Sequence, residues 1–201
     1  DVLAIQETKA KEEQFPMERL TALGYEVALH GLSQWNGVAI LSRVGLTDVE
    51  VGFPDMPSYG DPLAPEARAI GATCAGVRVW SLYVPNGRAL GDPHLAYKLD
   101  WLERLRRAAS GWLSTDPAAQ IALMCDWNIA PQYEDVWDMA VFAARTHVPP
   151  PARPAFQAIA HAGSHHFTQP PPPAPAPTPH FDPPPSILPP HHRLPTHPDP
   201  H

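Results

Sequence analysis

The chain has 201 residues, which is long enough for one domain with a hydrophobic core. Its formal net charge of −7 argues mildly against a nucleic-acid partner, because such binders usually carry a basic face, but an acidic cleft that holds a divalent cation would be compatible with it. The sequence shows no signal peptide and no apolar run of membrane length, so we expect a soluble cytoplasmic protein.

Proline and histidine divide the chain into two regions. Of the 28 prolines, 19 lie between Pro149 and Pro200, and nine of the 11 histidines lie from His147 onward. A segment this rich in proline lacks the backbone donors of helices and sheets and has little apolar surface to bury. We therefore expect a folded region over residues 1–163 and a disordered Pro/His-rich tail over residues 164–201, of the kind that a reading-frame change produces.

The first predicted elements are a strand, a helix and two further strands. An apolar run at residues 2–5 predicts a buried strand that ends in the polar segment Gln6-Glu7-Thr8-Lys9. A helical pattern over residues 15–23 closes at a glycine, which is a C-cap signal. Residues 25–29 and 38–41 are strand-like, and residues 44–67, rich in Gly, Pro and Asp, predict a surface loop.

The second half of the folded region continues the alternation. Residues 68–73 and 77–83 predict two strands joined by a tight turn at Ala75-Gly76. Another apolar run predicts a strand at residues 121–124, and a short helix is expected at residues 156–161. Strands that alternate with helices and end in polar clusters predict a layered α/β fold.

A long helix is predicted between these strands. Asp92 supplies an N-cap, and Pro93 supplies a first-turn proline. Apolar residues then follow at helical spacing on one face: Leu95, Leu99, Leu102, Leu105 and Trp112. The basic residues Lys98, Arg104 and Arg107 are assigned to the opposite face, which we expect to be solvated.

Three polar residues lie where predicted strands end: Glu7, Tyr83 and Asp126. Ligands of α/β sheets bind beyond the carboxyl ends of strands, and Mg²⁺ prefers carboxylate oxygen. Asn128 follows Asp126 by two residues, a spacing that points both side chains to one side of an extended segment. Spacing alone leaves capping, solvated or core roles open for each residue. Together they are compatible with a metal-dependent phosphodiesterase site.

Six segments occur in an order that resembles the exonuclease III and abasic-site (AP) endonuclease family. They are DVLAIQETK at 1–9, NGVAILS at 36–42, EAR at 66–68, YVPNG at 83–87, YKLDWL at 97–102 and DWNIAP at 126–131. The collinear resemblance covers roughly residues 1–163. It implies a four-layered α/β sandwich, in which two packed β-sheets are flanked by helices, here in an incomplete form.

The resemblance also implies an activity and roles for residues. The activity is that of a DNA-repair nuclease, a 3′→5′ exonuclease and AP endonuclease that uses Mg²⁺ or Mn²⁺ and acts as a monomer on double-stranded DNA with abasic sites or 3′ ends. Glu7, with Asp126 and Asn128, matches the metal site. Asp126 would activate water, Asn128 would orient it, and Tyr83 would stabilise the developing charge. Two further residues match motifs on the DNA-facing side, namely Arg68 and Asn86.

The chain departs from this family in three places. It begins after the strand that bears the family's metal-site asparagine, and Cys125 stands where family members have glycine. No counterpart of the later Arg-x-Asp segment or of the terminal Ser-Asp-His stretch is present, and the tail histidines lie in no Asp-His-x-Pro context. One alternative is therefore a catalytically dead fragment. Another is a different phosphatase of the same superfamily, which the Gln-Glu-Thr-Lys and Tyr-Val-Pro-Asn-Gly segments disfavour.

Overall fold

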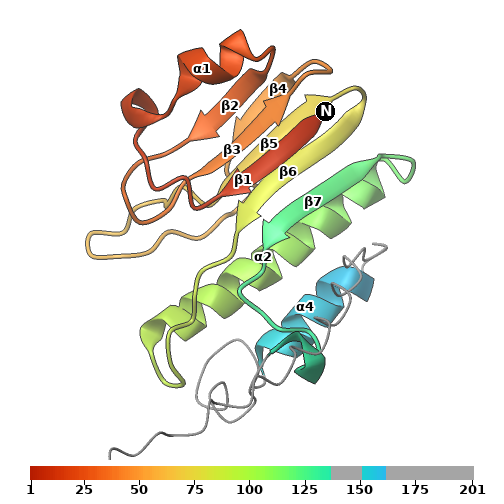
Figure 1. The fold of residues 1–201 in the computed structure, drawn as a ribbon. Coiled ribbons are helices and arrows are strands. Elements are labelled where there is room, and N and C mark those ends of the chain that lie inside the picture. Colours follow the sequence, from red (N-terminus) through yellow and green to blue (C-terminus); the bar gives the residue numbers. More distant parts are fainter. Residues whose placement is uncertain (137–150, 162–201) are drawn as a thin grey trace, which may run out of the picture. The chain divides into compact units, whose positions relative to one another are not determined.

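Two β-sheets form the centre of the part of the chain that the computed structural model describes, residues 1–136 and 151–161 (Figure 1). The first sheet has three antiparallel strands in the order β1 (Val2–Gln6), β3 (Val38–Ser42) and β2 (Glu26–His30). The second has four strands in the order β4 (Thr47–Val51), β5 (Ala69–Cys74), β6 (Val77–Tyr83) and β7 (Ile121–Asp126). Strands β6 and β7 are parallel, and a parallel pair needs a crossover connection, which here contains helix α2 (Pro93–Thr115).

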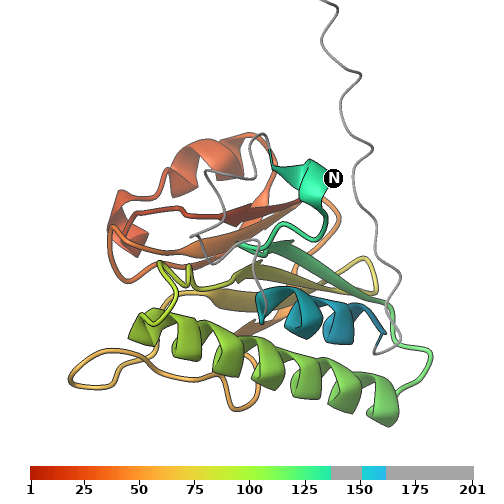
Figure 2. The same cartoon turned by 90° about the horizontal axis from the view of Figure 1, so that it is seen from below.

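Helices flank the two sheets. Helix α1 (Met17–Ala22) lies against β2, whereas α2 contacts α4 (Ala152–His161) and packs on the second sheet, on the face that points away from the first sheet (Figure 2). Two short 3-10 turns complete the described elements, η1 (Glu12–Gln14) and η2 (Tyr133–Asp135). This arrangement confirms the predicted α/β sandwich of two packed sheets with flanking helices. None of the described helices is long and apolar enough to cross a membrane.

Side chains of β6 alternate between two hydrophobic cores. Trp80 and Leu82 point toward α2, where they pack with Trp101. Val79 and Tyr83 point the other way, into the core between the two sheets. The alternation therefore turns Tyr83, the last residue of β6, toward the first sheet.

Most elements predicted from the sequence are confirmed, with ends shifted by a few residues. The tight turn at Ala75-Gly76 has positive φ angles of 48° and 84°, as a two-residue hairpin turn requires. The predicted cap of α2 is present, since Asp92 Oδ1 accepts a hydrogen bond from the His94 backbone N–H (2.8 Å). The loop predicted over residues 44–67 is wrong in one part, because β4 lies within it. That strand is exposed along its whole length at the edge of the sheet, so it carries no signal of apolar burial.

The solvated face predicted for Lys98 is also wrong. Lys98 is fully buried and lies on the same side of α2 as Leu102 and Leu105, which occupy the i+4 and i+7 positions relative to it. Arg104 and Arg107 do face solvent, with side chains 39% and 72% exposed. The predicted Pro/His-rich tail over residues 164–201 lies outside the described residues.

Candidate active site

Three strand ends meet at one edge of the two sheets. The parallel register of β6 and β7 places Tyr83 directly beside Asp126. Strand β1 of the first sheet packs over β6 and β7, and the Tyr83 hydroxyl donates a hydrogen bond to Glu7 Oε1. The three residues that the sequence placed at strand ends are therefore brought together, from both sheets.

The segment that carries Glu7 has an unusual backbone. Glu7 and Lys9 both have positive φ angles, 54° and 49°, which residues other than glycine rarely adopt. The backbone N–H groups of Thr8 and Lys9 donate to the carbonyl oxygens of Gly37 (3.2 Å) and Asn36 (3.0 Å), which holds the segment against the start of β3. A Cβ atom at Gly37 would lie 2.0 Å from Thr8 Oγ1. The Asn36-Gly37 motif thus lets the Glu7 segment approach closely.

A partly buried polar contact between the sheets positions the end of β1. Gln6 Nε2 donates to Ser81 Oγ (2.9 Å) and to the Met124 carbonyl oxygen (3.1 Å), so one side chain of β1 contacts both β6 and β7. Ser81 is fully buried, and its hydroxyl donates back to the Ile5 carbonyl oxygen (2.9 Å). Because Glu7 directly follows this contact, the distance between the sheets is fixed at the point where the site forms.

The charge state of Glu7 follows from its two partners. Lys9 Nζ lies 2.8 Å from Glu7 Oε2, while Tyr83 donates to the other oxygen. The hydrogen bond from Lys9, and next the one from Tyr83, hold the pKa of the Glu7 carboxyl below its usual value. Glu7 is therefore ionised at neutral pH, and its side chain is 41% exposed.

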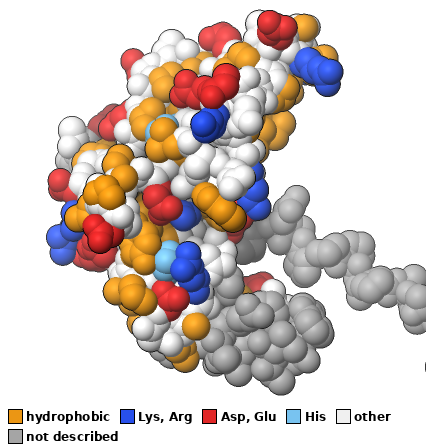
Figure 3. Space-filling model, turned by 90° about the vertical axis from the view of Figure 1, so that its left-hand side faces the viewer, with side chains coloured by type: hydrophobic (Ala, Val, Ile, Leu, Met, Phe, Trp, Pro, Cys, Tyr) orange, Lys and Arg blue, Asp and Glu red, His pale blue; other side chains and the backbone are white. Residues whose placement is uncertain are grey.

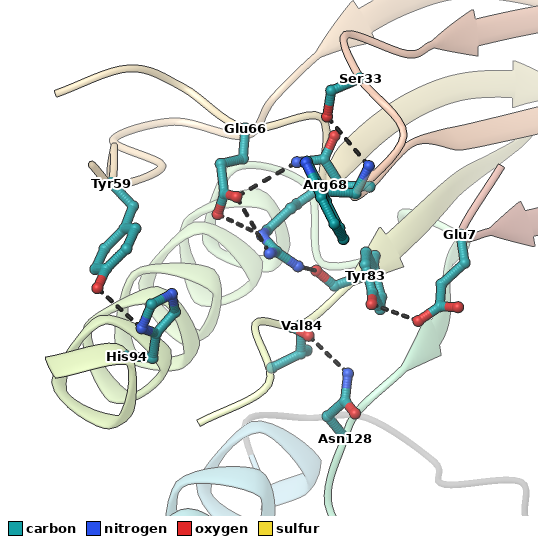
Figure 4. Close-up of polar contacts among 11 residues, drawn as sticks. Glu7, Ser33, Tyr59, Glu66, Arg68, Tyr83, Val84, His94 and Asn128 are labelled. Atoms are coloured by element: carbon teal, nitrogen blue, oxygen red, sulfur yellow. Dashed lines mark hydrogen bonds and ion pairs between the residues drawn. The ribbon is translucent and has the colours of Figure 1, made fainter. Parts of the chain in front are cut away.

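Arg68 and Glu66 support Tyr83 from the opposite side (Figure 4). Arg68 Nε donates to Glu66 Oε2 (2.7 Å), and its guanidinium carbon lies 4.9 Å from the centre of the Tyr83 ring. Burial raises the pKa of Tyr83 to about 12, and Glu7 adds to the effect through its hydrogen bond and charge. Arg68 is only 9% exposed and faces Glu66 and Tyr83, a placement that favours a supporting role over direct contact with DNA.

The segment after β7 is a turn and not the extended segment that the sequence spacing suggested. Asn128 has a φ of 48°, and its backbone N–H donates to Asp126 Oδ1 (3.0 Å). Its side-chain Nδ2 donates to the Val84 carbonyl oxygen (2.9 Å), so the amide is directed toward the residue after β6 (Figure 4). Cys125, which precedes the turn, is a partly buried free thiol whose pKa is raised by burial.

The sequence matches one protein family over most of its length. The model of the Endonuclease/Exonuclease/phosphatase family aligns with residues 1–188. The chain belongs to this family. The predicted resemblance to exonuclease III-type nucleases is confirmed by the solved structures to which the chain is similar.

Three solved structures show this similarity. The 3′-5′ exonuclease from Neisseria meningitidis is 33% identical, with a TM-score of 0.72, over 81% of this chain and 60% of that one. A Neisseria 3′ phosphatase bound to a product DNA hairpin is 32% identical, with a TM-score of 0.72 and the same coverage of 81% and 60%. An AP endonuclease from Archaeoglobus fulgidus is 32% identical, with a TM-score of 0.70, over 80% of this chain and 60% of that one. The chain thus spans about 60% of the length of the structures it matches.

Enzymes of this family generally depend on a divalent metal. Within residues 1–136 and 151–161, no group of three or more His, Cys, Asp or Glu side chains could hold a metal ion. Glu7 fits as one ligand, because it is ionised and its pairing with Lys9 is an exposed ion pair, which is a weak interaction. Mg²⁺ commonly takes one or two carboxylates and completes its shell with water and substrate phosphate. The described residues therefore fit a cation that Glu7 holds together with a phosphate substrate.

Two residues near the ends of β1, β6 and β7 were not predicted from the sequence to belong to the candidate site. Lys98 donates from Nζ to the Asn128 carbonyl oxygen (2.6 Å), and its i, i+4, i+7 relation to Leu102 and Leu105 is the signal that could have found it. Trp35 is 73% exposed in the loop before β3, at the same edge as Glu7 because Gln6 pairs with the first residue of β3. A space-filling view shows acidic and basic side chains interspersed with exposed apolar ones at the end of the molecule where β1, β6 and β7 finish (Figure 3).

Proposed function

We propose that this protein is a DNA-repair nuclease, acting as a monomer, that uses Mg²⁺ or Mn²⁺ to hydrolyse double-stranded DNA at abasic sites and from 3′ ends. The observation that carries the proposal is the convergence of Glu7, Tyr83 and Asp126 at the ends of β1, β6 and β7. Phosphodiester hydrolysis needs charge neutralisation at the phosphate, an activated water and stabilisation of the leaving oxygen. The similarity to an exonuclease and an AP endonuclease supports the substrate class.

Asp126 is the proposed general base, which takes the proton of the attacking water. Its Oδ1 accepts the Asn128 backbone N–H, and this contact fixes the direction of the carboxylate. The side chain of Asn128 in turn bonds to the Val84 carbonyl oxygen, which ties the turn to the end of β6. We assign Asn128 the role of orienting Asp126 and, through it, the water.

Glu7 and Tyr83 act on the phosphate in this proposal. A divalent metal held by Glu7 would supply neutralisation of the phosphate charge and polarisation of its bonds. Because the pKa of Tyr83 is about 12, its hydroxyl stays protonated at neutral pH and remains a hydrogen-bond donor. That donor can leave Glu7 for a phosphate oxygen on which negative charge develops.

The DNA contacts are proposed for exposed residues of the loops around this edge. Asn86 lies in the loop after β6, and its Oδ1 accepts the Arg88 backbone N–H (2.9 Å), which shapes that loop. Arg88 is exposed and can approach a phosphate, while Trp35 offers an exposed aromatic face. Arg68 contributes indirectly, since its guanidinium holds the Tyr83 ring in place.

The test is cleavage of a fluorescent duplex that carries one abasic-site analogue, with Mg²⁺ and with EDTA. Metal-dependent cleavage that is lost in Asp126→Asn and kept in Asp116→Asn supports the proposal. Asp116 is a suitable matched control because it lies at the C-terminal end of α2 and uses Oδ1 to accept the Ala118 N–H, which asparagine can also do. Absence of cleavage by folded wild-type protein refutes the proposal and favours the catalytically dead alternative.

A second candidate activity is removal of a 3′ phosphate from DNA, because one similar structure is that of a 3′ phosphatase with a product DNA hairpin. The same three residues would act on a phosphomonoester. A duplex that ends in a 3′ phosphate, assayed beside the abasic duplex, separates the two activities. Release of phosphate without chain cleavage would replace the nuclease proposal by this one.

A further inference from the structure

A buried cation lies directly beneath the turn that carries Asp126. Lys98 has no exposed surface, although it lies in the second turn of α2 on the face that carries the apolar residues Leu102 and Leu105. Burying a charge is unfavourable unless it is hydrogen-bonded, and an apolar side chain at such a core position is often neutral or stabilising by comparison. Packing alone therefore does not account for a lysine here.

The lysine bonds to the backbone of the turn. Lys98 Nζ donates to the Asn128 carbonyl oxygen at 2.6 Å, a short distance of the kind found in charge-assisted hydrogen bonds. Asn128 is the residue with a φ of 48°, so the bond holds a peptide whose conformation is not the preferred one. Burial lowers the pKa of Lys98 to about 8, and the negative charge of Asp126 acts in the opposite direction.

Other contacts hold the rest of the same turn. The Val84 N–H donates to the Asp126 carbonyl oxygen (3.0 Å), so β6 holds the start of the turn. Arg153 Nε, from α4, donates to the Ala130 carbonyl oxygen (2.8 Å). Two helices thus each direct one cation at a carbonyl of residues 126–130, and Lys98 makes the contact nearer to Asp126.

We propose that Lys98 is a positioning residue, which fixes residues 126–130 from the protein interior so that the Asp126 carboxylate is held in its working orientation. The importance of that orientation for hydrolysis rests on the proposed function. The contact itself does not, because it can be observed without substrate. In this assignment Lys98 touches neither DNA nor metal, and its effect passes through the Asn128 carbonyl.

The experiment compares backbone amide hydrogen exchange in the full chain, in wild type and in Lys98→Met. Methionine has a similar length but no donor and no charge. We expect the amide protons of Val84 and Asn128 to exchange about tenfold faster or more, which is the effect of losing one hydrogen bond to a charged group. Exchange in β5 should stay as in wild type. Arg107→Gln, on the exposed side of the same helix, is the matched control and should leave both regions unchanged.

A second substitution separates the contact from simple space filling. Lys98→Arg keeps a buried cationic donor and should restore part of the protection that Lys98→Met loses. If Lys98→Met does not fold, Lys98→Gln, which removes the charge and shortens the side chain, replaces it with the same expectation. Unchanged exchange at Val84 and Asn128 in a folded variant overturns the inference. Faster exchange spread equally through β5 also overturns it, because that result indicates a purely structural role.

The kinetic arm links the contact to the chemistry. If wild type cleaves the abasic duplex, Lys98→Met should lower kcat about tenfold or more while KM changes less than about threefold, since no substrate contact is removed. A change confined to KM would overturn the positioning role. If wild type does not cleave, the proposed function fails, and the exchange experiment still decides whether Lys98 holds the turn.

Discussion

Replacing Ser81 by alanine should weaken the contact between the two sheets at the point where the site forms. The Ser81 hydroxyl is fully buried, accepts Gln6 Nε2 (2.9 Å) and donates to the Ile5 carbonyl oxygen (2.9 Å). Alanine removes both hydrogen bonds. Gln6 keeps its bond to the Met124 carbonyl oxygen, so the main loss is the partner of the Ile5 carbonyl. A buried polar group left without a partner costs about 1–3 kcal/mol, and we expect Ser81→Ala to lower the free energy of unfolding by about 2 kcal/mol.

Urea denaturation measures this change, with an m-value equal to that of wild type if the unfolded state is unaffected. A double-mutant cycle with Gln6→Ala should give a coupling energy of about 1 kcal/mol, because each substitution removes the same contact. Ser114→Ala is the control, since its exposed hydroxyl bonds within α2 to the Ser110 carbonyl oxygen (2.7 Å), and it should change stability by less than about 0.5 kcal/mol. A Ser81→Ala effect as small as the control, or additivity in the cycle, would refute the reasoning.

Three further outcomes are expected. In an alkaline titration followed by ultraviolet absorbance, Tyr83 should ionise near pH 12, and Tyr83→Phe should remove this ionisation step. Because the pKa of Tyr83 lies above the usual 10.0, its contribution to the stability of the fold is complete below about pH 10 and is lost as the pH rises through 12. Gly37→Ala should displace the Glu7 segment and lower the cleavage rate, because the new Cβ would lie 2.0 Å from Thr8 Oγ1. Gly45→Ala is the control, since φ is also positive at Gly45 but a Cβ there meets nothing within 4 Å, and it should lower the cleavage rate less. Trp35→Ala should weaken DNA binding by about 1–2 kcal/mol in a fluorescence-anisotropy titration, which is the order of one lost stacking contact, and should leave the salt dependence of the affinity unchanged. An affinity equal to that of wild type would show that Trp35 does not contact DNA.

The sequence predicts the features that local chemistry determines. The φ angles at Ala75-Gly76 follow from the residues that tolerate a tight hairpin turn, and Asp92 caps α2 because its short side chain reaches the free N–H of His94. The position of Glu7 at the end of a strand could also be predicted, since an apolar run stops there.

The features that depend on tertiary contacts could not be predicted in the same way. Strand β4 is defined by pairing with β5, and its five exposed residues carry no pattern of burial. The turn at Asn128 depends on the carbonyl oxygen of Val84 and on the ammonium group of Lys98, which are 44 and 30 residues away in the sequence. From sequence alone, a charged side chain is predicted to be solvated, because its buried hydrogen-bond partner is not known. For this reason the solvated position predicted for Lys98 was wrong.

The order in which the strands fold determines when during folding the candidate active site forms. Strands β5, β6 and β7 with α2 form one continuous stretch of chain, whereas Gln6 meets Ser81 across a separation of 75 residues. Contacts between distant residues form late because loop closure must precede them, so we expect Tyr83 and Asp126 to become neighbours before Glu7 reaches them. Among the strands that the structure describes, β1 lies at one edge of the first sheet, and fraying of this strand would remove the Glu7 carboxylate while the second sheet stays folded. Docking of β1 is therefore the step that brings Glu7 to Tyr83.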